Sequence, residues 1–389
     1  MTPEARIAAA IAILDAALDG QAAEQALTRW ARGSRFAGSR DRAAVRDHVY
    51  DALRCRRSFA ALGGAETGRG LMIGLLRAGG VAPESLFTGV GYGPEPLTAE
   101  EGAPPPDLTT LPRGVRLDCP DWLMPDFDTA LGDNADEVLT RMRQRAPVYL
   151  RANARHGREA AARALAAEGV ETTLTDNSNF AMEVYDKAQK IKTTKAYSGG
   201  LVELQDFSPQ RAVEALPLHD GMRVMDYCAG GGGKTLAMAA RADLVLTAHD
   251  AIPARMKDLP ARAARAGIAV TQADTGALAK MPPFDLVLTD VPCSGTGTWR
   301  RAPEAKWTLT PDRLAGLVTL QAEILDRAAR LVAPGGWLIY MTCSLLPREN
   351  RGQIDPFLDR NQGIALRHDR LYTPLDGGDG FYAAHLSRV

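Results

Sequence analysis

The sequence predicts an α/β protein whose C-terminal part forms a doubly wound parallel sheet, preceded by a small α+β module and an all-helical N-terminal domain. Two observations support this prediction. From Gly221 onward, short apolar strands alternate with helical stretches rich in Ala, Arg and Leu, as in a parallel sheet covered by helices on both faces. Near the N-terminus, apolar residues instead recur at helical spacing. We expect domains at 1–130, 131–215 and 216–389.

The N-terminal helices follow from two apolar series, each of which places its members on one face of a helix. These series are Ile7, Ile11, Leu14, Leu18 and Val45, Val49, Leu53. Ser39 is a suitable start for the helix that carries the second series. The stretch 89–112 is rich in Gly and Pro and is expected to be a loop.

The central and C-terminal elements are predicted from short apolar runs. In the module we expect strands at 148–153, around 171–184 and at 201–206, with a helix between Gly157 and Gly169. The sheet strands are expected at 222–228, 244–250, 268–274, 284–292 and 337–344. Thr310 and Pro311 should begin a helix, and the pair at 335–336 should end it before the last of these strands.

Bulk composition excludes several classes of protein. Of the 389 residues, 46% are hydrophobic and 24% are charged, which is typical of folded soluble chains. No apolar run approaches the ~20 residues of a spanning helix, so we expect a cytoplasmic protein, and a monomer. The five cysteines form no CxxC pair, which argues against a zinc site, and we expect no metal and no disulfide framework. The net charge of −1 gives no global attraction to nucleic acid.

Acidic and cysteine residues stand at successive strand ends, where ligands bind in such sheets. They are Asp226, Cys228, Asp250, Asp274, Asp290, Cys293 and Cys343. The first strand leads into CAGGGGKT at 228–235, whose glycines let the backbone approach a ligand closely. This segment lacks the spacing of a phosphate loop and of a dinucleotide fingerprint, which favours a nucleoside ligand without a pyrophosphate.

Two of these acids suit an adenosine-type cofactor. Asp250 lies roughly 20 residues after the glycine turn, where a carboxylate accepts hydrogen bonds from ribose hydroxyls. Asp274 could accept a hydrogen bond from the adenine amino group. S-adenosylmethionine fits this combination, because the loop amides can hold its amino-acid end. A single acid at such a position is more often a helix cap or a loop residue.

The segment DVPCSG at 290–295 indicates the chemistry. Methyltransferases that act on amino groups have an aromatic residue after two prolines here, whereas this chain has Cys293. C5 of cytosine is too weak a nucleophile alone, and a thiolate that adds to C6 activates it. Cys343, at the next strand end, offers a second thiol. The alternative is that both cysteines are small buried apolar residues.

Four segments resemble the NOL1/NOP2/Sun family of RNA cytosine-C5 methyltransferases: DYCAGGGGKT, DVPCSGTGTWRR, the TCS that contains Cys343, and DGFYAAHL. The resemblance runs from Val148 to the C-terminus, and the helical part is similar to a NusB-like RNA-binding domain. It implies a Rossmann-like methyltransferase sheet in which Cys343 attacks C6 and Cys293 assists product release. It also implies that Asp290 hydrogen-bonds or protonates the cytosine ring at N3 and that Lys234 lies near the active site.

The expected cofactor-binding set extends around the glycine turn and the strand ends. It comprises Asp226, Cys228, Ala229, Gly230, Gly231, Gly232, Gly233, Lys234, Asp250, Arg255, Asp274 and Asp290. The family's glycine segment usually reads CAAPGGK, so Gly230 and Gly231 replace Ala and Pro here. The extra glycines increase loop freedom and put the cofactor affinity in question.

RNA contacts are expected from arginines. Arg300 and Arg301 follow the PCSG loop, and Arg42 and Arg46 belong to an arginine-rich stretch at 29–57. A solvated surface is the alternative for both groups. Ribosomal RNA of the small subunit (16S) is the expected substrate and transfer RNA its rival. An inert RNA-binding factor on this fold, or a DNA cytosine-C5 methyltransferase with its nucleophile at Cys293, are further alternatives.

Overall fold

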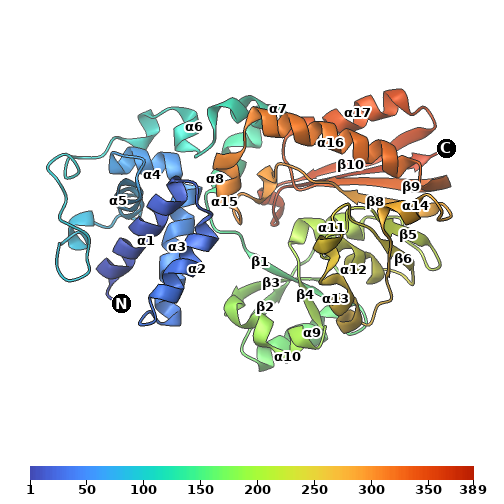
Figure 1. Cartoon of the computed structure of the whole chain (residues 1–389), viewed down its shortest axis with the longest axis horizontal. Helices are drawn as coiled ribbons and strands as arrows, with labels where there is room; N and C mark the ends of the chain where they lie inside the picture. The colour runs from blue at the N-terminus through green and yellow to red at the C-terminus, as the bar shows by residue number, and fades with distance from the viewer. The chain divides into compact units, whose positions relative to one another are not determined.

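A computed structural model describes residues 1–389 (Figure 1). The chain forms two compact units. The first contains Met1–Arg145 and Trp299–Thr308, and the second contains Ala146–Thr298 and Leu309–Val389. The predicted three-part division at 130 and 215 stays a prediction, but the module and the large sheet fall in the same unit here.

The first unit is helical. Its helices are α1 (Pro3–Leu18), α2 (Ala23–Gly33), α3 (Ser39–Arg54), α4 (Arg56–Gly63), α5 (Gly68–Ala78), α6 (Arg113–Arg116), α7 (Met124–Leu131), α8 (Ala135–Met142) and α15 (Pro303–Thr308). Short 3-10 turns lie at Pro83–Ser85, Leu108–Thr110, Asp121–Leu123 and Gly132–Asn134. The predicted loop therefore has no long helix. Ser39 is the first residue of α3, and its cap is Gly38, whose N–H donates to the Asp41 carboxylate at 3.0 Å.

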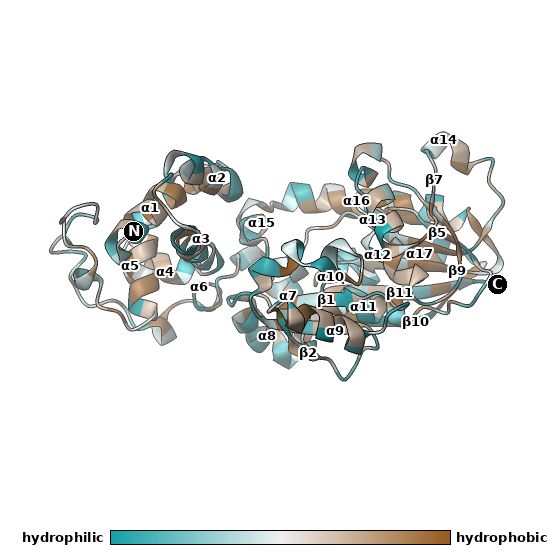
Figure 2. Ribbon diagram, turned by 90° about the horizontal axis from the view of Figure 1, so that it is seen from below, coloured by the Kyte–Doolittle hydropathy of each residue, from teal (hydrophilic) through white to brown (hydrophobic).

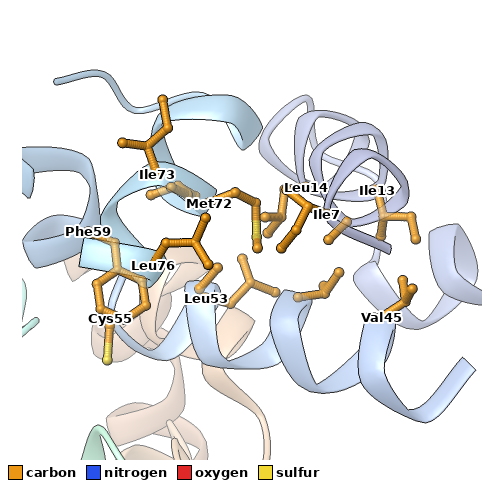
Figure 3. Close-up of a cluster of buried hydrophobic side chains, with 14 of the residues drawn as sticks. Ile7, Ile13, Leu14, Val45, Leu53, Cys55, Phe59, Met72, Ile73 and Leu76 are labelled. Atoms are coloured by element: carbon orange, nitrogen blue, oxygen red, sulfur yellow. The ribbon is translucent and has the colours of Figure 1, made fainter. Parts of the chain in front are cut away.

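The apolar faces of α1, α3 and α5 form the core of this unit (Figure 3). Leu14 and Val45 are fully buried, as their spacing predicts. On α1 the buried face includes Ile13, whereas Ile11 is only partly buried. Burying each such side chain stabilises the fold by roughly 1.5–3 kcal/mol. α4 and α5 approach so closely that a Cβ at Gly74 would lie 2.0 Å from the Phe59 carbonyl oxygen, so the contact requires glycine.

The segment Trp299–Thr308 belongs to the helical unit although it follows the PCSG loop in sequence. The Trp299 ring is buried and meets Phe127 edge-on, with ring centroids 5.5 Å apart. The Lys306 ammonium donates to the Arg54 carbonyl at 2.8 Å, and the Trp307 indole N–H donates to the Leu53 carbonyl at 2.7 Å. The predicted domain 216–389 thus contains ten residues that pack with the helices.

The second unit begins with a four-stranded antiparallel sheet in the order β2-β3-β1-β4. Its elements are β1 (Val148–Ala152), α9 (Arg158–Ala167), β2 (Glu171–Leu174), β3 (Ala181–Asp186), α10 (Lys195–Ser198) and β4 (Val202–Leu204), with a 3-10 helix at Ala188–Thr193. Leu150, Leu165, Met182 and Val202 fill its core. The strands and the helix expected in this module are confirmed.

A seven-stranded sheet follows, in the order β10-β11-β9-β8-β5-β6-β7. Its strands are β5 (Arg223–Asp226), β6 (Val245–Ala248), β7 (Thr271–Gln272), β8 (Phe284–Asp290), β9 (Val332–Thr342), β10 (Ile364–Tyr372) and β11 (Phe381–Arg388). Strands β5 to β9 pair in parallel, and β11 runs antiparallel to β9 and β10. The predicted doubly wound sheet is confirmed, with two further strands, β10 and β11, that the apolar runs did not indicate.

Helices cover both faces of this sheet (Figure 1). They are α11 (Phe207–Glu214), α12 (Gly233–Ala239), α13 (Leu259–Ala266), α14 (Thr275–Leu278), α16 (Pro311–Ala329) and α17 (Arg351–Arg360). α16 and α17 lie on one face, and α11, α12 and α13 lie on the other. The strands β5 and β9 between them are coloured mostly as apolar in Figure 2. No helix of the chain combines the length and the apolar character that a membrane span requires.

The boundary between α16 and β9 corrects one expectation. Thr310 caps α16 as predicted, because its hydroxyl accepts from the Arg313 N–H at 3.2 Å. Gly335 and Gly336, however, lie inside β9 and do not end the helix, which stops at Ala329. The pairing with β8 skips residues 333–336, so the two glycines form a bulge. The φ of Gly335 is +75°, a conformation that favours glycine.

Candidate active site

The order of the sheet places one crevice beside β5. The chain proceeds from β5 to β6 on one side, whereas β8 lies on the other side of β5, so the connections that follow these strands diverge. A cavity of about 610 Å³ opens at this point. The predicted residues that line it are Asp226, Cys228, Ala229, Gly230, Gly231, Gly233, Lys234, Arg255, Asp290, Cys293 and Cys343. Gly232, Asp250 and Asp274 are not among its lining residues.

The glycine turn joins β5 to α12. Gly230 and Gly232 have φ values of +49° and +77°, and a Cβ at Gly232 would lie 2.2 Å from Leu259 Cδ1. Glycine at 232 is therefore required by both the backbone and the packing. Asp250, at the end of β6, accepts from the N–H of Gly230 at 3.0 Å and from the N–H of Ile252 at 2.9 Å. Its carboxylate thus holds the turn from the neighbouring strand.

Asp226 is a deeply buried acid beside the glycine turn. One carboxylate oxygen accepts from the Thr235 hydroxyl at 2.6 Å, and the other has no hydrogen-bond partner. Burial raises the pKa of Asp226 to about 6, and the nearby negative charge of Asp290 adds to the rise. Asp226 therefore presents an unsatisfied polar atom beside the cavity.

Asp274 and Arg255 occupy different environments. Asp274 is exposed and caps α14, because its carboxylate accepts from the Ala277 N–H at 2.8 Å. Its expected contact with adenine stays a prediction. Arg255 lies on the cavity wall, 3.6 Å from the Asp250 carboxylate.

Lys234 and Asp290 form an ion pair between α12 and the end of β8. The Lys234 ammonium also lies over the Phe381 ring, 5.1 Å from its centroid. Burial lowers the pKa of Lys234, but the charges of Asp290, Asp226 and Cys343 raise it, and the net pKa lies above its usual value. The site therefore keeps a positive charge at the end of this side chain.

Cys293 and Cys343 follow β8 and β9, which are paired strands, and their sulfur atoms lie 3.2 Å apart. The contact with Cys343 and burial both raise the pKa of the Cys293 thiol well above its usual value. The negative charge of Glu349 raises it further. Cys293 is therefore a protonated thiol at neutral pH, which can donate its hydrogen to the neighbouring sulfur.

Glu349 is a residue of the site that the sequence did not single out. It is completely buried and accepts hydrogen bonds from both cysteine loops. The Ser294 N–H donates to it at 2.8 Å, the Ser344 hydroxyl at 2.5 Å and the Gln321 amide at 2.9 Å, and the Ser294 hydroxyl also donates. Since Ser294 follows Cys293 and Ser344 follows Cys343, Glu349 fastens the two thiols together.

Two cationic residues of the cavity wall were also missed, Arg262 and Arg313. Arg262 donates to the Gly231 carbonyl and lies 3.0 Å from the Glu203 carboxylate. Arg313 is exposed at the start of α16. Their only signal in the sequence is their position near the starts of α13 and α16, which does not indicate where the side chains point.

The predicted RNA-contacting arginines belong to the helical unit. Arg300 is 2% exposed, so its side chain does not present a surface for a phosphate in this conformation. Arg301, Arg42 and Arg46 are exposed. Arg42 also donates to the Ala37 carbonyl at 3.0 Å. No group of three or more His, Cys, Asp or Glu residues is arranged to hold a metal ion.

Proteins similar to this one are known, and they identify its family. Residues 213–387 match the family model described as 16S rRNA methyltransferase RsmB/F, and residues 119–188 match its ferredoxin-like domain. Ribosomal RNA small subunit methyltransferase B of Photorhabdus laumondii is 31% identical over 287 residues, which are 69% of this chain and 66% of that protein. The chain belongs to the RsmB/F family. The protein of the same name from Xanthomonas campestris is 36% identical over 251 residues, which are 62% of this chain and 57% of that protein.

These matches span about two thirds or less of the relatives' own length. Two solved structures share the fold of this RsmB/F member. The crystal structure of PH0851 covers 100% of the chain and 99% of its own, with a TM-score of 0.76 and 20% identity. That of NSun6 from Pyrococcus horikoshii with SFG covers 69% of this chain and 98% of its own, with a TM-score of 0.60 and 16% identity. The Rossmann-like methyltransferase fold is thereby confirmed.

Proposed function

We propose that this protein methylates C5 of a cytosine in RNA, most specifically in 16S ribosomal RNA, with S-adenosylmethionine as the methyl donor. The observation that carries the proposal is the pair of thiols, 3.2 Å apart, in a cavity that also holds the Lys234–Asp290 ion pair and the glycine turn. Methylation of an amino group needs no thiol, whereas carbon C5 needs a nucleophile at C6. Membership of the RsmB/F family supports the RNA substrate.

The residues present fit S-adenosylmethionine. The glycine turn leaves backbone N–H groups beside the cavity, and the unpartnered oxygen of Asp226 can accept a hydrogen bond there. Asp250 already accepts two backbone hydrogen bonds, but a carboxylate has further lone pairs for ribose hydroxyls. Bound S-adenosylmethionine would supply an electrophilic methyl group. The NSun6 structure was solved with SFG, an analogue of this cofactor, which is consistent with the same use here.

In the proposed mechanism Cys343 is the nucleophile. Its thiolate forms a bond to C6, and the electron pair of the C5–C6 double bond moves toward C5, where it can attack the methyl carbon. The Lys234 ammonium lines the same cavity as this sulfur. Asp290, held by Lys234, lies at the end of the neighbouring strand, where the pair can deliver a proton to N3 and return it later.

Cys293 assists the release of the product. When the C5 proton leaves to a base, the bond between C6 and Cys343 breaks and the electron pair returns to the Cys343 sulfur. The Cys293 thiol, 3.2 Å away and protonated, donates a hydrogen bond to that sulfur as it departs. The exposed Arg313 at the cavity wall is suited to contact the phosphate of the target nucleotide.

The test is transfer of labelled methyl from S-adenosylmethionine to unmodified small-subunit ribosomal RNA, with transfer RNA in parallel, followed by nucleoside analysis. We expect 5-methylcytidine in the ribosomal RNA. Label in transfer RNA alone would keep the chemistry and change the substrate. No label and no cofactor binding would favour an inert RNA-binding factor.

Two cysteine variants separate the roles of the thiols. Cys343→Ala should abolish transfer, and Cys293→Ala should accumulate a denaturant-resistant adduct between protein and RNA. Cys119→Ala, a buried cysteine of the helical unit, is the matched control and should show neither effect. An adduct on Cys293 in the unmodified protein would contradict the assignment and favour the order of roles found in DNA cytosine-C5 methyltransferases.

A further inference from the structure

The turn between β5 and α12 contains four glycines in succession, at 230–233. Glycine loses more conformational freedom on folding than any other residue, so a turn of this composition keeps one shape only when other residues hold it. Asp250 holds the N–H of Gly230 from the neighbouring strand. The carbonyl groups of Gly231 and Gly233 accept from side chains that are distant in the sequence. The shape of the turn therefore depends on residues outside it.

Arg262 makes one of these contacts from α13. One nitrogen of its guanidinium, Nη1, donates to the Gly231 carbonyl, and the other, Nη2, donates to the Glu203 carboxylate at 3.0 Å. Glu203 is a buried residue of β4, in the antiparallel module. Figure 1 shows α13 beside β4. The guanidinium therefore joins the module to the glycine turn.

The missing side chain of Gly231 leaves the space for this contact. A Cβ at Gly231 would lie 3.0 Å from Arg262 Nη1, whereas non-bonded heavy atoms prefer separations of about 3.5–4.0 Å. The arginine has little room to give way, because the carbonyl and the Glu203 carboxylate hold both of its terminal nitrogens. Glycine at 231 and arginine at 262 are therefore matched, since the arginine restrains a turn that the glycine leaves free.

Arg265 provides a comparison on the same helix. It also pairs with Glu203, and its side chain is 21% exposed, against 23% for Arg262. Its guanidinium lies over the Tyr197 ring, 4.7 Å from the centroid, and it does not line the cofactor cavity. Glu203 thus has a second cationic partner, so the ion pair alone does not explain why Arg262 reaches the turn.

We propose that Arg262, held by Glu203, is a positioning residue that fixes the shape of the glycine turn for the cofactor. The guanidinium restrains the Gly231 carbonyl before the cofactor binds, so the turn needs little further ordering when it does. The module thereby contributes to the cofactor site through β4. The proposal rests on the proposed function, because it concerns the binding of S-adenosylmethionine at that site.

Two measurements test the role of Arg262: calorimetric affinity for S-adenosylmethionine, and hydrogen–deuterium exchange of the segment 229–236 in the cofactor-free protein. Arg262→Met keeps a long side chain and removes both donors. We expect faster exchange in this segment and binding weaker by about 2- to 12-fold, the net value of one hydrogen bond. Arg262→Lys keeps the charge and should recover part of the affinity. In steady-state kinetics the KM for S-adenosylmethionine should rise while kcat changes little.

A substitution at Gly231 separates positioning from a general structural role. Gly231 does not have a positive φ, so alanine can adopt its backbone conformation. Gly231→Ala alone should weaken cofactor binding, because its Cβ displaces the arginine from the carbonyl. In the Arg262→Met variant the flexible methionine can move aside. There the same substitution should strengthen binding by about 2- to 5-fold, because alanine reduces the freedom of the turn.

Arg265→Met is the matched control. It removes the other partner of Glu203 and should change neither the exchange of the turn nor the affinity, and thermal melts of the two methionine variants are compared. Glu203→Gln should weaken binding in the unmodified protein and add little in the Arg262→Met variant.

Unchanged exchange and affinity in Arg262→Met, or an equal loss in Arg265→Met, would overturn the proposal. An effect of Gly231→Ala that is the same in both backgrounds would also overturn it. Methyl transfer is scored separately. Intact cofactor binding without methyl transfer counts against the proposed chemistry alone, whereas normal transfer and normal affinity in Arg262→Met count against the positioning role alone.

Discussion

Replacing Glu349 tests how the two cysteine loops are held together. Glu349→Ala removes the acceptor of four hydrogen bonds in a fully buried place. The Ser294 hydroxyl can turn to Ser344, 3.4 Å away, but the Ser294 N–H has a fixed direction and is left without a partner. The Gln321 amide keeps only its bond to the Pro292 carbonyl. Two unsatisfied donors cost about 2–6 kcal/mol of the free energy of unfolding, at about 1–3 kcal/mol each.

Glu349→Gln is the matched control. Its amide oxygen can keep the Ser294 N–H and Gln321, and its amide N–H groups can donate to the two serine hydroxyls. We therefore expect a loss below about 2 kcal/mol. Urea unfolding followed by circular dichroism measures both losses, with each unit fitted as its own transition.

The two Glu349 variants also separate the effect of the lost hydrogen bonds from the effect of the lost negative charge. Glu349 raises the pKa of Cys293, so Glu349→Gln should lower that pKa, and alkylation of Cys293 by iodoacetamide should begin at lower pH. Peptide mass spectrometry reads the modification at Cys293 alone. If Glu349→Ala unfolds at the same urea concentration as the unmodified protein, or if Gln costs as much as Ala, the hydrogen-bond argument is refuted.

Three further outcomes follow from buried positions. Because the pKa of Asp226 rises from 3.8 to about 6 on folding, its ionisation opposes folding by up to about 3 kcal/mol above pH 6 and by nothing below pH 4. Asp226→Asn should therefore gain stability relative to the unmodified protein as pH rises from 4 to 7.5, and a pH-independent difference in melting would contradict this. Gly232→Ala should lower the free energy of unfolding by roughly 1–3 kcal/mol, because of the positive φ and the clash with Leu259, and should weaken cofactor binding in calorimetry. Gly363→Ala is the control, because a Cβ there meets no other atom, and it should have neither effect. Trp299→Ala should cost about 3–5 kcal/mol and lower the melting transition of the helical unit, although Trp299 lies late in the sequence; a shift in the other unit alone would refute this.

The sequence predicted the parts of the fold that depend on local patterns. Strands β5, β8 and β9 are buried runs of apolar residues, which identify parallel strands whatever their partners are. β10 mixes partly buried and exposed residues without a regular period, so no local pattern indicated the strand, although it pairs with β11, the next strand in the chain. The expectation that Gly335 ends a helix is wrong because a glycine bulge inside a strand and a helix stop have the same composition.

Some residues of the candidate active site could be predicted from the sequence and others could not. Acids and thiols at strand ends were recognisable because the carboxyl ends of parallel strands share one edge, which brings Asp226, Asp290 and Cys343 to one cavity. Glu349 was missed because a glutamate is ordinarily exposed, and only the tertiary structure shows four donors around it. The burial of Arg300 could not be predicted either, because an arginine in a polar loop gives no sign of burial in the sequence.

The helical unit can be completed only after the segment Trp299–Thr308 has been synthesised. When the ribosome has finished Arg145, the helices lack the tryptophan and lysine side chains that complete their interior. About 150 residues later those side chains arrive, after a delay on the order of ten seconds at typical rates of translation. Until then the nascent helices carry an open apolar slot and are exposed to chaperones and proteases. A fragment ending at Arg145 would keep that slot permanently, so expression of the helical part alone requires the ten-residue segment to be supplied as well.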